Sequence, residues 1–91
     1  MLKKYLISFR EEDLNNESLD NAIRSRIEHL SPKTWFQIFP NLILIQSDLS
    51  IGKILAEIET ICQNKRTVIT EISDCVTNEE PLNDALKEYG Y

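Results

Sequence analysis

Two kinds of apolar spacing follow one another along this chain, and their order restricts its fold more than any other feature. Apolar side chains recur every three or four positions, the spacing of a helix with one buried face, in residues 19–30 and 51–62. β-Branched and aromatic side chains, which are typical of strands, dominate residues 5–9, 35–39 and 67–72, and residues 42–46 begin with the apolar run Leu-Ile-Leu-Ile. Only Pro40 and Asn41 separate the strands at 35–39 and 42–46, and so short a link requires an antiparallel hairpin.

The resulting order is strand, helix, strand, strand, helix, strand. This order predicts an α+β, ferredoxin-like βαββαβ fold, in which a four-stranded antiparallel sheet carries two helices on one face. A short third helix is expected over residues 81–89, because Pro81 is tolerated in a first turn and Leu82, Ala85, Leu86 and Tyr89 share one face. The chain has 91 residues, enough for one domain. We therefore expect a ferredoxin-like domain over residues 1–76 and a helical extension over residues 77–91.

The strands are apolar on both faces. An antiparallel sheet with one solvated face alternates apolar and polar residues, whereas residues 42–45 read Leu-Ile-Leu-Ile. Two helices cover only one face, so the other is expected to be an apolar patch that a second copy of the chain buries. The candidate dimer interface consists of Tyr5, Ile7, Phe9, Trp35, Leu42 and Leu44. The alternative is that the C-terminal helix folds back over this face.

The charge of the chain disfavours nucleic acid as its main partner. There are 15 acidic and 10 basic residues, a net charge of −5, and binding to phosphates needs a concentrated positive field. Five of the acids lie in residues 11–20, which also hold no base. We expect a protein partner with a basic surface to bind this acidic segment through Glu11, Glu12, Asp13, Glu17 and Asp20. The Glu79-Glu80 region is a second candidate surface for the same partner. The alternative nucleic-acid patch consists of Lys3, Lys4, Arg10, Lys65 and Arg66.

Residues that carry chemistry are few. His29 is the only histidine and is interpreted as structural or solvent-exposed. Gly52 and Gly90 are the only glycines, which excludes a glycine-rich phosphate loop. No catalytic residue, no metal ligand and no cofactor are predicted. The sequence shows no secretory signal and no membrane-spanning run, so Cys62 and Cys75 are expected to be reduced and the chain to be cytoplasmic, without a membrane partner.

Four segments carry a resemblance to a known family: Tyr5-Leu6-Ile7-Ser8-Phe9, the strand at Trp35, Gln46-Ser47-Asp48-Leu49-Ser50, and Val68-Ile69-Thr70-Glu71-Ile72. Over residues 4–76 the chain resembles the SinR-like small bacterial proteins. These are relatives in fold of the small CRISPR-associated endonucleases that partner the integrase in spacer acquisition. The resemblance implies a ferredoxin-like fold and a dimer formed through the sheet. The endonucleases hold a divalent ion with an aspartate in a Tyr-Asp pair after the first strand. Here the matching pair is Phe9-Arg10, and a guanidinium would repel the ion.

The leading hypothesis is a non-catalytic, dimeric protein-interaction module, such as an immunity protein, an antitoxin or a phage-encoded inhibitor. One alternative is a divalent-metal-dependent nuclease related to the small CRISPR-associated endonucleases, using Glu11, Glu12 or Asp13 in place of the missing aspartate. Another is a nucleic-acid-binding protein that uses the basic residues named above. These hypotheses differ in the surface on which they depend.

Overall fold

The computed structural model describes residues 1–10, 17–62 and 65–91. The elements follow the predicted order and begin or end within three residues of the predicted bounds. They are β1 (Lys3–Phe9), α1 (Glu17–His29), β2 (Phe36–Phe39), β3 (Leu42–Ser47), α2 (Ile51–Cys62), β4 (Thr67–Ile72) and α3 (Glu80–Glu88). Within these described ranges, no helix has the length and apolar character needed to cross a membrane.

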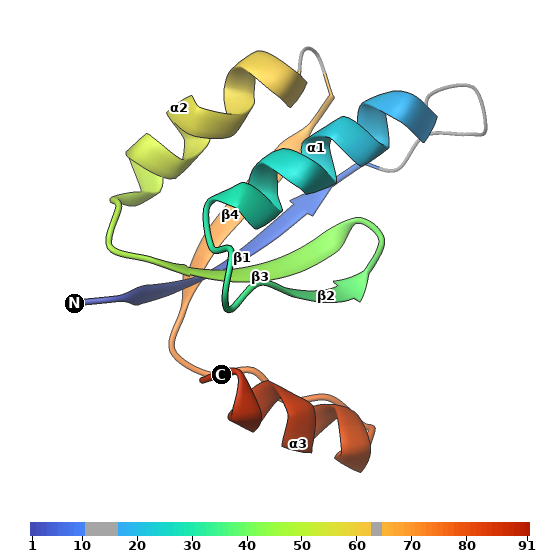
Figure 1. Ribbon diagram of the computed structural model, residues 1–91, viewed down its shortest axis with the longest axis vertical. Helices are drawn as coiled ribbons and strands as arrows, with labels where there is room; N and C mark the ends of the chain where they lie inside the picture. The colour runs from blue at the N-terminus through green and yellow to red at the C-terminus, as the bar shows by residue number, and fades with distance from the viewer. Residues whose placement is uncertain (11–16, 63–64) are drawn as a thin grey trace.

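The strands form one antiparallel sheet in the order β2-β3-β1-β4. β1 lies at the centre, with Leu6 opposite Leu44 of β3 and Thr70 of β4. Figure 1 shows α1 and α2 side by side on one face of this sheet. The predicted α+β, ferredoxin-like fold is therefore confirmed.

The main core lies between the sheet and these two helices. β1 contributes its odd-numbered residues, because alternate side chains of a strand point to the same face. The helices pack against these strand residues with side chains that recur every three or four positions. In α2 these buried side chains are Ile54, Ile58 and Cys62. The buried members of this core are Tyr5, Ile7, Phe9, Ile23, Ile27, Ile43, Ile45, Ile54, Ile58 and Cys62. Each large apolar side chain that is removed from water here contributes about 1.5–3 kcal/mol.

A second, smaller core lies on the opposite face, where α3 covers the sheet (Figure 1). Leu86 of α3 and Tyr91 pack with Leu44 of β3, and all three side chains are buried. Half-buried side chains surround them: Leu6, Phe36, Ile38, Ile72 and Cys75. The C-terminal helix thus folds back over the outer face, which is the alternative that the sequence left open.

Hydrogen bonds at the end of α3 hold this helix on the sheet. The Gln46 side-chain amide donates to the carbonyl oxygens of Tyr89 and Gly90, at 3.2 and 3.0 Å. The Tyr91 hydroxyl donates to the carbonyl oxygen of Thr34 at 2.8 Å, and burial raises the pKa of this phenol. Gly90 has a φ of +95°, and a Cβ there would lie 2.7 Å from the Gln46 amide nitrogen. Only glycine fits this close turn without strain.

Candidate interaction surfaces

Most residues of the predicted dimer interface are buried inside a single chain. Tyr5, Ile7 and Phe9 are at most 2% exposed beneath α1 and α2, and Leu44 is buried beneath α3. Placing these four residues on an open face was therefore wrong. The apolar strand residues could not show which of them face α1 and α2. Of the six candidates only Trp35, at 37% exposed, and the half-buried Leu42 remain near the surface.

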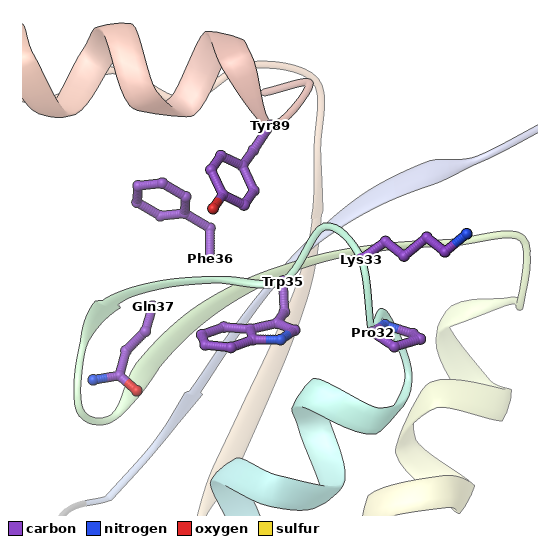
Figure 2. Close-up of a pocket in the computed structure, with 6 residues that line it drawn as sticks. All are labelled: Pro32, Lys33, Trp35, Phe36, Gln37 and Tyr89. Atoms are coloured by element: carbon purple, nitrogen blue, oxygen red, sulfur yellow. The ribbon is translucent and has the colours of Figure 1, made fainter.

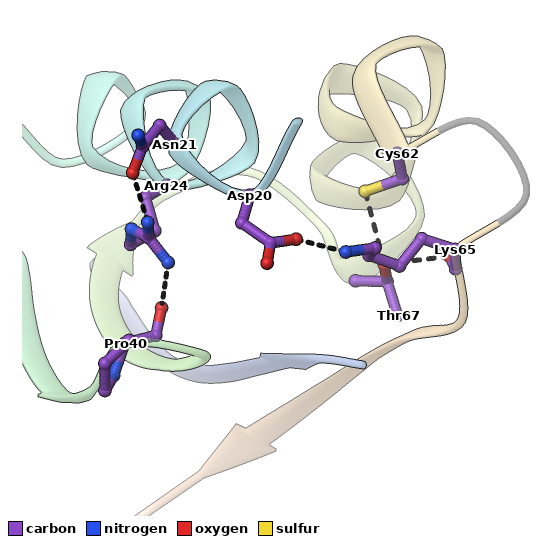
Figure 3. Close-up of polar contacts among 7 residues, drawn as sticks. All are labelled: Asp20, Asn21, Arg24, Pro40, Cys62, Lys65 and Thr67. Atoms are coloured by element: carbon purple, nitrogen blue, oxygen red, sulfur yellow. Dashed lines mark hydrogen bonds and ion pairs between the residues drawn. The ribbon is translucent and has the colours of Figure 1, made fainter. Parts of the chain in front are cut away.

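The predicted acidic surface is also changed by the fold. Glu11, Glu12 and Asp13 lie outside the described residues, and Glu17 begins α1. Asp20 is buried and forms an ion pair with Lys65, which follows α2 (Figure 3). The Lys65 ammonium also lies 5.9 Å from the centre of the Phe9 ring, within reach of a cation–π attraction. Asp20 is therefore a structural residue and is not available to a partner.

The predicted basic residues do not form one patch. Lys65 is buried and forms an ion pair with Asp20, so its charge is not available at the surface. Lys3 and Lys4 begin β1, whereas Arg10 follows its other end and donates its backbone N–H to the Arg66 carbonyl oxygen at 3.0 Å. A strand of this length separates its two ends by about 20 Å. The positive charges are thus divided between two small sites, one at each end of β1.

The outer edge of β4 has no neighbouring strand among the described residues. β4 is six residues long, and among the described residues it pairs with β1 alone, in a continuous antiparallel register. It contains no proline and no lysine, and Val68 is 53% exposed. An edge strand presents a row of backbone N–H and C=O groups to any other extended chain.

An apolar groove runs beside this edge, between β4 and α2. It has a volume of about 240 Å³ and is lined by Ile51, Gly52, Leu55, Thr67 and Ile69. Ile51 and Leu55 are 44% and 42% exposed, although they lie on the helical stripe that the sequence predicts to be buried. Both side chains line the groove, and in the described part of the chain β4 is the outermost strand on this side of the sheet. The groove can therefore accept apolar side chains from an added strand.

The opposite edge of the sheet is protected. β2 has only four residues, its register with β3 shifts between Gln37 and Phe39, and Pro40 follows it directly. Shortness, a bulge and a proline are the devices by which natural sheets prevent pairing at an edge. The contrast between the two edges is the reason for regarding β4 as the functional edge.

A second concave surface lies where α3 ends above β2, shown in Figure 2. Its volume is about 320 Å³, and its lining consists of Pro32, Lys33, Trp35, Phe36, Gln37 and Tyr89. The rings of Phe36 and Tyr89 meet edge to face, with their centres 5.3 Å apart. Trp35 lies on the other side of the β2 backbone (Figure 2). This lining holds no carboxylate, histidine or thiol that could serve as a general base.

Among the described residues, the two thiols and the possible metal ligands are also poorly placed for chemistry. Burial, with a smaller contribution from the Asp74 carboxylate, raises the pKa of the Cys75 thiol, which keeps it in its less reactive form. The Cys62 sulfur is buried and accepts a hydrogen bond from the Thr67 hydroxyl at 3.2 Å. In residues 1–10, 17–62 and 65–91 no three His, Cys, Asp or Glu side chains gather as a metal site would require.

Comparison of the chain with protein-family models, with curated proteins and with solved structures gives no match. The fold and the surfaces described above are therefore the grounds for inferring function.

Proposed function

We propose that this chain is a non-catalytic protein-interaction module of the cytoplasm, and that it binds extended polypeptide at the outer edge of β4. The observation that carries this proposal is the contrast between the two edges of the sheet. β2 is shortened, bulged and followed by Pro40, whereas β4 is regular, β-branched and free of proline. The unpaired thiols of Cys62 and Cys75 agree with a reducing compartment.

Strand addition gives this surface both affinity and specificity. Backbone hydrogen bonds along the edge supply affinity that does not depend on side chains, and pockets for alternate side chains supply selectivity. Here the selective element is the groove of Ile51, Leu55 and Ile69 on one face, while Val68 and Thr70 are exposed on the other. A partner strand with apolar side chains on one face therefore suits this edge.

The acidic residues of α3 contribute to partner choice. Glu79, Glu80, Asp84 and Glu88 are all exposed on or beside this helix. A negative surface of this kind accelerates encounter with a basic partner. The predicted preference for a basic protein surface is therefore kept in this proposal, with the exposed acids of α3 as its support.

Position-specific photo-crosslinking in the native cell tests this proposal. A benzophenone amino acid is introduced at Val68 on β4, and at Thr60 in the control, because both side chains are exposed and only Val68 lies on the edge strand. Irradiation is expected to give a discrete polypeptide adduct from position 68 and none from position 60, as judged by gel mobility and mass spectrometry. Absence of a polypeptide adduct at position 68, or equal adducts at both positions, contradicts the proposed function.

A further inference from the structure

The charges at the two ends of β4 have opposite sign. Arg66 is exposed immediately before the strand, whereas Asp74 is exposed just beyond its end. Two antiparallel copies of such a strand bring the positive end of each against the negative end of the other. A parallel arrangement instead places Arg66 against Arg66. The strand is thus complementary in charge to a second copy of itself.

We infer that β4 pairs with β4 of a second copy of this chain about a twofold axis, joining the two sheets into one of eight strands. This inference rests on the proposed function and names the occupant of the β4 edge. Twofold association uses the same patch on both copies, so that patch must be self-complementary. The β4 edge is self-complementary in its charges, in the side chains that pair across the axis, and in the groove beside α2.

Side-chain pairing fixes the register. Val68, Thr70 and Ile72 share one face of β4, because they lie opposite Ser8, Leu6 and Lys4 of β1. Centring the axis on Thr70 places Thr70 against its own copy, Val68 against the partner's Ile72, and Arg66 against the partner's Asp74. Threonine pairs, β-branched apolar pairs and opposite charges are all favourable cross-strand neighbours.

The groove beside β4 is completed by the same pairing. On the face that α2 covers, Ile69 of each copy lies opposite the partner's Glu71 and is a diagonal neighbour of the partner's Ile69, within side-chain reach across the axis. The two α2 helices then lie side by side over the joined strands, and Ile51 and Leu55 of each face those of the other. Residues of α2 that are more than 40% exposed in one chain, Ile51 and Leu55, become buried in the pair.

Charge reversal tests the pairing through sedimentation velocity on the full chain. Arg66→Asp sets two aspartates against each other at both ends of the interface, and Asp74→Arg sets two arginines together. Each variant alone is expected to dimerise about ten- to a hundredfold more weakly than the original chain, since two exposed ion pairs become repulsions. An equimolar mixture of the two variants is expected to recover the original affinity, because each copy then meets the opposite charge.

Lys33→Asp and Gln37→Arg are the controls, since both residues are exposed and lie just before or on β2, at the opposite edge of the sheet. They are expected to dimerise like the original chain. Circular dichroism checks that all four variants are folded. If the mixture of the two variants dimerises as weakly as each variant alone, the antiparallel pairing is overturned. If the original chain sediments as a monomer, a second copy is not the occupant of the β4 edge. In either case, an adduct of another mass from position 68 shows that the proposed function still stands.

Discussion

Replacing Asp20 by alanine is expected to lower the free energy of unfolding by about 3–5 kcal/mol, because it leaves a buried ammonium without its counter-charge. The side chains of Lys65 and Asp20 are 1% and 6% exposed, so water cannot take the place of the missing carboxylate. The pair also joins the first turns of α1 to the segment between α2 and β4 (Figure 3). Urea denaturation followed by circular dichroism measures the change.

The double variant Asp20→Leu with Lys65→Met is the control for this prediction. Replacing a buried ion pair by apolar side chains of similar volume is often neutral or stabilising, because the cost of desolvating two charges disappears. The double variant is therefore expected to be close to the original chain in stability and far more stable than the single variant. An Asp20→Ala variant that loses less than about 1 kcal/mol would show that the pair is effectively solvated.

Replacing Leu86 by alanine is expected to release α3 while the rest of the fold stays intact. Leu86 is 1% exposed and belongs to the outer core, which is separate from the core beneath α1 and α2. Removing a buried leucine side chain costs about 2–5 kcal/mol, and here the cost falls on the contact between α3 and the sheet. Backbone amides of α3 are then expected to exchange with deuterium about 30-fold faster or more, while those of β1 change little.

Leu82→Ala, at a half-buried position of the same helix, is the control and is expected to have a smaller effect. Equal acceleration in α3 and β1 would contradict the separation of the two cores, because the helix would then unfold only with the whole domain.

The fold was predictable because the apolar spacing within each element and the short links between elements can both be read from neighbouring residues. The stripe from Ile51 to Cys62 and the short link at Pro40 and Asn41 are visible in the sequence, and together they leave few topologies. The orientation of β1 was not predictable, because Tyr5, Leu6 and Ile7 are apolar in succession and give no alternation. Residues 42–45 indicated correctly that both faces of the sheet are covered. Which element covers the outer face depended on packing of Leu86 and Tyr91.

The contacts that fix individual side chains were beyond sequence reasoning. Asp20 and Lys65 are 45 positions apart, and Gln46 reaches Gly90 across 44 positions. Local spacing carries no signal for such contacts. The β4 edge, in contrast, could have been found from the sequence. A ferredoxin-like order places the last strand at an edge, and residues 67–72 contain neither the proline nor the lysine that protect edges.

Hydrogen–deuterium exchange of the original chain, measured over a range of protein concentrations, tests the assignment of β4 as the interface most directly. Pairing at this edge protects those β4 amides that point away from β1, so their exchange is expected to slow as concentration rises. Amides of β2, on the protected edge, are expected to exchange at the same rate throughout. Protection that grows in β2 or α3 while β4 stays unchanged would contradict the account.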